Sequence, residues 1–247
     1  MTNLLKAEGL KLRKSFGFWI LVCVFAAITI FVSIVYTISA ESMATMGVVA
    51  NGINGFYWAF EEIEVNGIFI SLFSVIFICG EFSNRTIGIS LFSGLPRRKM
   101  MFAKIITMFA GTVLLMSVQP VLMSVILTIT HGFGASLAEN AVPMLGTYAL
   151  YLLGCITTAA VCALLAYAIR NVGGAIGACI GVNFFLAIAA KLPFESLNHV
   201  LRFSFASQIL VVNSKTLDVP FYFGVMILTM LLALVAAAVV FDKSDLK

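Results

Sequence analysis

The sequence predicts an all-α membrane protein with six transmembrane helices, an N-terminal interfacial helix and outer re-entrant helices between the fifth and sixth spans. Composition is the first reason, because 62% of the 247 residues are hydrophobic and only 11% are charged, whereas soluble domains carry about 25% charged residues. Six apolar segments of span length are the second reason. The uneven placement of Lys and Arg is the third. Together they exclude an ordinary cytosolic enzyme, a disordered chain and a disulfide-stapled secreted module.

The first 15 residues predict a short helix lying in the membrane interface. One helical face carries small and apolar residues, namely Leu5, Gly9, Leu12 and Phe16. Lys6 and Arg13 lie away from this face, which suits an interfacial helix. The alternative is a solvated basic flank that only sets the topology.

The whole chain, 1–247, is expected to form a single transmembrane domain. Its predicted spans cover about 16–39, 65–80, 102–130, 145–169, 172–190 and 220–241. The first is longer than the roughly 7–15 residues of a secretory signal core, so we expect a retained helix. Pro120 in the third predicts a kink. Only Arg170 and Asn171 separate the fourth span from the fifth, which predicts a tight helical hairpin.

Basic residues set the expected orientation of these spans. An even number of spans places both termini on one side. That side holds twelve of the 15 Lys and Arg residues, namely Lys6, Lys11, Arg13, Lys14, Arg85, Arg97, Arg98, Lys99, Lys104, Arg170, Lys243 and Lys247. The other side holds Lys191, Arg202 and Lys215. Because cytoplasmic loops carry the excess of Lys and Arg, both termini are expected in the cytoplasm.

Two segments outside the spans are unusually apolar for loops. The outer segment 191–219 is too polar to span yet rich in Leu, Ile, Val and Phe, so we expect short helices that dip partly into the outer leaflet. The cytoplasmic segment 81–101 mixes apolar residues with cations. A solvated loop would not need that apolar content, so something should cover it. Glu81 and Arg85 stand in the favourable order for a helical ion pair.

Catalytic and metal-binding motifs are absent from the sequence. It contains no Gly-x-x-x-x-Gly-Lys-Ser/Thr phosphate loop, no His-Glu-x-x-His and no Gly-x-Ser-x-Gly. The five cysteines form no Cys-x-x-Cys pair and are interpreted as apolar packing residues. We therefore expect no enzymatic activity and no cofactor in this chain.

A few polar and small residues within the spans invite two interpretations. Gln119 and Asn183 could line a transport pathway, but hydrogen bonding between helices is the simpler interpretation. Glycines recur every four residues at Gly173, Gly177 and Gly181, which predicts close helix packing, within the chain or across a dimer. The ionisable residues of the spans lie at predicted helix ends, where they can reach water, namely Glu81, Lys104, Arg170 and Lys191.

The cytoplasmic segment resembles the permease subunits of type-two ATP-binding cassette (ABC) exporters. The resemblance rests on a Glu, a Thr-Ile pair, a small-residue turn, an Arg-rich step and a Lys, here Glu81, Thr86-Ile87, Ser93-Gly94, Arg97-Arg98 and Lys104. The family often has Gly before the Thr, whereas this chain has Arg85. The layout of six spans with an interfacial N-terminal helix is also similar.

The resemblance implies that this segment is a coupling helix seated in a groove of a separate ATPase subunit. The implied coupling residues are Glu81, Phe82, Arg85, Thr86, Ile87, Gly94, Arg97, Arg98, Lys99 and Lys104. It also implies two permease copies, two ATPases that bind ATP and Mg, and outer re-entrant helices. Short six-span permeases of this kind often export, or protect against, amphipathic peptides such as bacteriocins and peptide toxins.

Coupling also has an independent physical argument. A membrane protein without an ATP site can use ATP only if motion of a partner is transmitted mechanically, and an apolar, cationic segment joined directly to two spans suits that role. The alternatives are a basic loop that binds lipid headgroups, an ATP-independent channel or small-molecule carrier, a membrane enzyme, and a sensor or scaffold. The spread of the charges gives no nucleic-acid-binding face.

Overall fold

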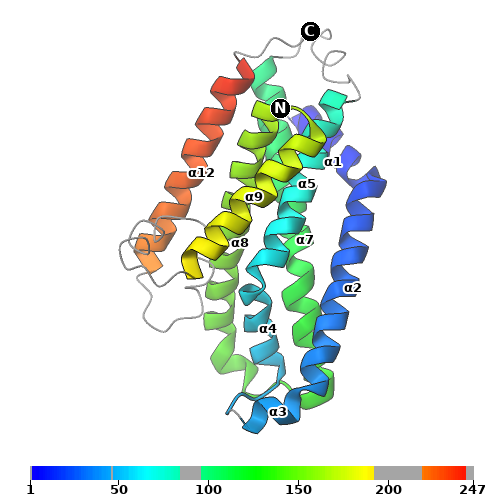
Figure 1. The fold of residues 1–247 in the computed structure, drawn as a ribbon, viewed down its shortest axis with the longest axis vertical. Helices are drawn as coiled ribbons and strands as arrows, with labels where there is room; N and C mark the ends of the chain where they lie inside the picture. Colours follow the sequence, from blue (N-terminus) through cyan, green and yellow to red (C-terminus); the bar gives the residue numbers. More distant parts are fainter. Residues whose placement is uncertain (1, 46, 84–95, 192–218, 243–247) are drawn as a thin grey trace.

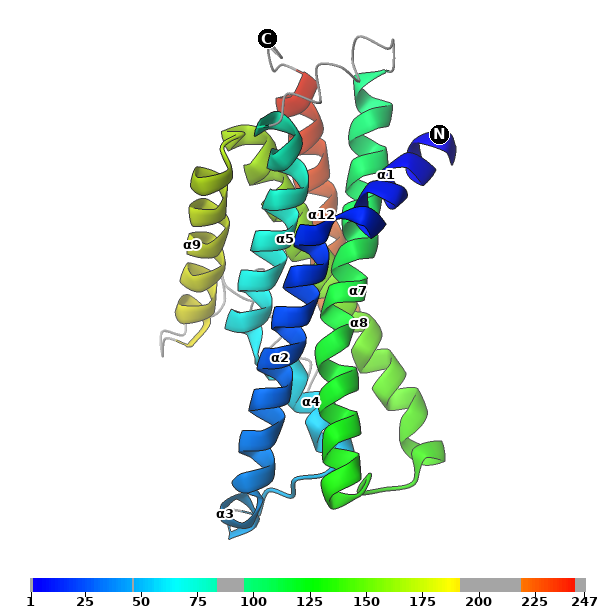
Figure 2. The same cartoon turned by 90° about the vertical axis from the view of Figure 1, so that its right-hand side faces the viewer.

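The computed structural model describes residues 2–45, 47–83, 96–191 and 219–242, and the regular secondary structure of these residues is entirely helical. Long helices pack side by side in a bundle, and a short N-terminal helix crosses one end of it (Figures 1 and 2). Residues 84–95, within the predicted coupling segment, and residues 192–218, the predicted re-entrant segment, lie outside the described residues.

Nine helices make up the described part of the chain. They are α1 (Thr2–Lys14), α2 (Phe16–Ile38), α3 (Ala40–Thr45), α4 (Gly52–Glu61), α5 (Ile63–Ser83), α7 (Arg97–His131), α8 (Leu137–Ile169), α9 (Val172–Lys191) and α12 (Val219–Asp242). In the described residues, α2, α5, α7, α8 and α12 are long and apolar enough to cross a membrane. The all-α membrane class is confirmed, and the count of six spans stays a prediction.

Several helices extend beyond the predicted spans. The spans were predicted at 65–80, 102–130 and 145–169, but α5 continues to Ser83, α7 begins at Arg97 and α8 begins at Leu137. The predicted bounds followed the apolar stretch, whose length matches the hydrocarbon layer of the bilayer. A helix can continue beyond that layer into the polar interface. Consequently Arg97, Arg98 and Lys99 belong to the first turn of α7. This helix runs without interruption through Pro120.

The junction of α1 and α2 is fixed by two local hydrogen bonds. The Ser15 hydroxyl caps α2 by accepting from the Phe18 backbone N–H at 3.3 Å. The Trp19 indole N–H donates to the Arg13 carbonyl oxygen at 2.9 Å. These bonds hold the bend between the helix that crosses the bundle end and the helix that runs along the bundle (Figure 2).

The buried face of α1 differs from the predicted one. Glu8 and Leu12 are buried, whereas Gly9 and Phe16 of the predicted face are exposed. The sequence argument grouped apolar residues and so excluded an acid from the inner face. The structure places Glu8 there because two lysines surround it, as described below.

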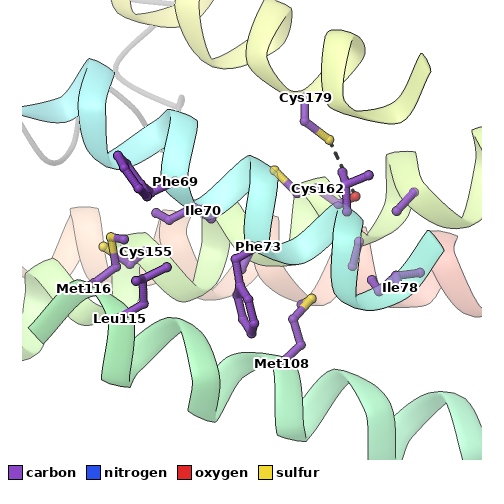
Figure 3. Packing of buried hydrophobic residues seen from close by; sticks show 14 of the residues in the cluster. Phe69, Ile70, Phe73, Ile78, Met108, Leu115, Met116, Cys155, Cys162 and Cys179 are labelled. Carbon is purple, nitrogen blue, oxygen red and sulfur yellow. Dashed lines mark hydrogen bonds between the residues drawn. The ribbon is translucent and has the colours of Figure 1, made fainter. Parts of the chain in front are cut away.

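The core of the bundle is built from aromatic rings, Met and small side chains. Phe73 of α5 extends toward Met108 of α7 (Figure 3), and the ring of Phe69 packs on that of Phe25 of α2 at a centroid distance of 4.6 Å. At the opposite end from α1, the short helix α4 packs closely on α7, with its Gly52 N–H donating to the Gly132 carbonyl oxygen at 3.0 Å. The core thus joins α5 and α7, the two helices that flank residues 84–95.

Candidate functional site

Four charged side chains from three helices meet at the bundle end crossed by α1. The Lys104 ammonium of α7 lies 2.7 Å from Glu81 Oε1 of α5 and 3.4 Å from Glu8 Oε2 of α1. Lys11 of α1 lies 2.6 Å from Glu8 Oε1 and 2.9 Å from Glu81 Oε1. We call these four residues the ionic cluster. Two acids alternate with two bases, so the cluster is formally neutral.

The central members of the ionic cluster are buried. The side chain of Lys104 is 6% exposed and that of Glu8 is 7% exposed, while Glu81 is 19% exposed. The Lys104 ammonium also lies 4.8 Å from the centre of the Phe77 ring, within cation–π distance. Moving such charges from water costs several kcal/mol per ion unless each finds its partner. The paired geometry therefore holds α1, α5 and α7 to one arrangement.

Lys11 forms the outer edge of the ionic cluster, with its side chain 51% exposed. Partial burial lowers the pKa of Lys11, but hydrogen bonds to Glu8 and Glu81 and their negative charges outweigh burial and hold the pKa above its usual value. Lys11 is therefore charged at every physiological pH. It links the buried cluster to the aqueous surface.

Packing above the cluster depends on a glycine of α7. A Cβ atom at Gly111 would lie 2.4 Å from Phe73 Cζ and 3.2 Å from Leu12 Cδ2. The bare backbone at this position lets α5 and α1 approach α7 together. Leu12 stands one helical turn after Glu8, so this contact and the ion pairs fix the same face of α1.

The predicted position of Lys104 at a solvated helix end is wrong, because α7 begins two turns earlier and α1 covers the residue. Sequence reasoning also missed Glu8 as a site residue. It is the only acid among the first 40 residues, and it lies three positions before Lys11. An isolated acid in a basic, amphipathic helix was the signal in the sequence that could have identified Glu8.

The other predicted coupling residues are distributed around the cluster. Arg98 Nε lies 2.7 Å from Asp242 Oδ2, and this exposed ion pair joins the start of α7 to the end of α12. The Phe82 ring stands 6.1 Å from the Tyr167 ring of α8. Arg97 and Lys99 are exposed on the first turn of α7. Arg85, Thr86, Ile87 and Gly94 lie outside the described residues.

Asn183 of α9 sits at a junction of three helices. Its Nδ2 donates to Ser71 Oγ of α5 at 3.1 Å and to the Cys179 carbonyl oxygen at 2.9 Å. The same nitrogen lies 3.9 Å from Cys162 Sγ of α8. Such bonds between helices are the structural alternative to cargo contact. Gln119 is buried, and its Oε1 has no hydrogen-bond partner within the described part of the chain.

The glycine stripe of α9 does not provide packing within the described chain. Gly173, Gly177 and Gly181 are exposed, and a Cβ atom at Gly177 or Gly181 would meet no atom within 4 Å. The helix instead packs on α5 and α8 through Ala175 and Cys179. Of the two predicted uses of the stripe, packing against another molecule stays open to test.

Comparison with known proteins adds the family. A family model described as "ABC-2 family transporter protein" matches residues 4–190, which include the ionic cluster, α9 and the predicted coupling segment. No curated protein matches the chain. Among the described residues, no group of His, Cys, Asp or Glu is arranged to hold a metal ion.

Proposed function

The chain belongs to the ABC-2 transporter family, and on this premise we propose that it is the permease subunit of an exporter driven by a separate ATPase. Permeases of this family are membrane transport components and not themselves catalytic. The observation that carries the proposal is the ionic cluster. It joins α5 and α7, the helices on either side of residues 84–95, to each other and to α1.

Coupling requires that a displacement at residues 84–95 reach the membrane without being lost. Glu81 lies at the end of α5 that leads into this segment, and Lys104 lies two turns into the helix that follows it. Their 2.7 Å contact, shielded from water, resists separation of the two helices. The Glu8 contact extends this connection to α1, so we propose that the three helices respond together.

The proposed partner is an ABC ATPase that binds ATP and Mg and docks on residues 81–101. We propose two such subunits and two permease copies. The exposed face of α9 carrying Gly173, Gly177 and Gly181 supports a second copy, because a bare helix face permits close backbone approach. The assembly is proposed to reside in the cytoplasmic membrane with both termini in the cytoplasm.

The proposed cargo is amphipathic or hydrophobic, and peptides such as toxins or antimicrobial peptides are the specific proposal. The chain has 22 Phe and 11 Met residues, which suit contact with apolar cargo. Resemblance to short permeases supports the peptide class. Transport would lead out of the cell.

Co-purification with candidate ATPase subunits tests the docking proposal. Arg97→Glu/Arg98→Glu reverses two charges at the start of α7, and we expect it to reduce both complex formation and ATP-driven transport at least tenfold. Asp242→Asn is the matched control, because it removes the ion pair of Arg98 while leaving both arginines. Full complex formation and transport by the double variant, or transport in vesicles that contain no ATPase, would overturn the proposal.

The cargo class is tested separately in cells. Deleting the protein should sensitise cells to a secreted amphipathic peptide or retain that peptide inside them. An unchanged response and distribution across a panel of such peptides would reject peptide export and leave the ATPase-docking result unaffected.

A further inference from the structure

A cavity of about 280 Å³ lies beside the ionic cluster, between α1, α2, α5 and α7. One end is polar, with Lys11, Ser15 and Glu81 in its lining. The other end is apolar and is lined by Phe18, Leu21 and Phe73, while Phe77 lies against the Lys104 ammonium between the two ends. Such a division of the lining suits a ligand with a charged head and a hydrocarbon chain.

The polar end of the cavity lies at the level expected for the membrane–water boundary. Ser15, in its lining, is the residue between α1 and α2. Trp19, one turn further on, is half exposed and donates its indole N–H to the Arg13 carbonyl oxygen. Trp side chains prefer this boundary, with the ring in the apolar layer and the N–H at the headgroups. The apolar end therefore lies at acyl-chain depth.

Charge at the polar end favours an anion. Lys11 uses two of its ammonium protons for Glu8 and Glu81, and the remaining proton is available because the side chain is half exposed. Arg13 and Lys14 follow in the last turn of α1 and are also exposed. These added cations make the surface around the cavity basic even though the ionic cluster is neutral.

We propose that this cavity binds an anionic phospholipid of the adjoining leaflet, with its phosphate near Lys11 and part of one acyl chain against the contacting rings of Phe18 and Phe73. The cavity volume falls just below the range of small-molecule pockets, about 300–1,000 Å³. It therefore accommodates a chain segment, not a whole lipid. A free inorganic anion would leave the apolar end unfilled, and a zwitterionic lipid would gain less from the cations at the polar end, because its own ammonium offsets the phosphate charge.

Gly80 offers a position from which an introduced side chain can enter the cavity. It lies in the lining, and a Cβ atom at this position would meet no atom within 4 Å. Gly80→Leu should therefore occupy the cavity next to Glu81 and exclude the headgroup and the start of the acyl chain. Gly224→Leu is the matched control, since Gly224 is an exposed glycine of α12 with equally open surroundings.

The experiment is native mass spectrometry of the purified full chain, exchanged with phosphatidylglycerol or phosphatidylcholine. We expect the wild type and Gly224→Leu to retain one phosphatidylglycerol, and Gly80→Leu to retain at least tenfold less at the same melting temperature. Lys11→Gln should reduce the preference for phosphatidylglycerol over phosphatidylcholine about fivefold, as loss of one cation near the headgroup predicts. Equal retention by Gly80→Leu and wild type, or equal retention of the two lipids by wild type, would overturn the proposal.

Discussion

Lys104 is the residue on which the arrangement of the candidate site depends most. Its ammonium is buried between two glutamates that come from different helices. These two carboxylates pair with the ammonium in place of water. Buried ion pairs contribute little net stability compared with apolar residues, but removing one partner leaves an uncompensated charge. The role of such a cluster is therefore to specify one arrangement of the helices.

Replacing Lys104 alone should destabilise the protein strongly. Lys104→Met leaves Glu8 and Glu81 with Lys11 as their remaining shared cation, so one buried negative charge is uncompensated, and we expect a loss of about 3–5 kcal/mol in the free energy of unfolding. The measurement is denaturant unfolding in detergent.

The triple variant Glu8→Gln/Glu81→Gln/Lys104→Met separates charge from packing. Because it removes the uncompensated charges together with the ammonium, it should recover most of the stability lost by Lys104→Met. A loss below about 1 kcal/mol in Lys104→Met would show that the ion pairs are not formed in the native protein.

Asn183 should behave as a structural residue. Asn183→Ala removes the hydrogen bond to Ser71, and hydrogen bonds between membrane helices contribute about 0.6 kcal/mol on average. Ser71→Ala should have a similar effect, and the double variant should lose little more than either alone. If Asn183→Ala instead changes the concentration dependence of transport while stability is retained, Asn183 contacts cargo.

At the scale of elements, α1 is a docked part of the bundle. Its Leu12 packs toward Gly111 of α7 and its Glu8 reaches Lys104 of the same helix. The amphipathic pattern predicted the helix, because periodic apolar residues carry that information, and its position in the membrane interface stays a prediction. It misassigned the inner face, since a pattern of apolar residues cannot reveal that Glu8 pairs with Lys104 of α7 as well as with Lys11 of its own helix.

A single methyl group at Gly111 should loosen this docking. Gly111→Ala would place its Cβ 2.4 Å from the buried ring of Phe73, so the ring or a helix must shift, at a cost of about 1–3 kcal/mol. Gly224→Ala is the control, and it should be neutral or slightly stabilising because its surroundings are open. Equal thermal stability of the two variants would contradict the close packing of α1, α5 and α7.

On the scale of the whole molecule, hydropathy predicted the class of the protein, because bilayer thickness sets the length of apolar segment that can span it. The orientation inferred from the placement of Lys and Arg stays a prediction. Helix ends were less predictable, as α7 and α8 show, since a helix does not stop where the bilayer does. The ionic cluster brings together side chains at positions 8, 81 and 104, which are far apart in the sequence. Its formation therefore depends on tertiary packing. Glu81 and Lys104 were selected by resemblance, whereas Glu8 emerged only from the structure.

The arrangement of the bundle leads to a prediction about topology. α1 and the final residues of α12 lie at the same end (Figure 1), as an even number of crossings requires. Reporter fusions at the two termini should therefore both be active in the cytoplasm, and a cysteine introduced at Glu139 should react with a membrane-impermeant thiol reagent from outside. Reaction of the terminal positions from opposite sides would contradict six crossings.

The most direct test of the account is the amount of cargo moved per ATP hydrolysed, measured in proteoliposomes that contain the permease and its ATPase. The triple variant Glu8→Gln/Glu81→Gln/Lys104→Met is compared with wild type, after equal folding and equal ATPase binding are established. We predict continued ATP hydrolysis with at least a tenfold lower transport ratio, because the link between α1, α5 and α7 is lost. An unchanged ratio would show that the ionic cluster does not transmit ATPase motion.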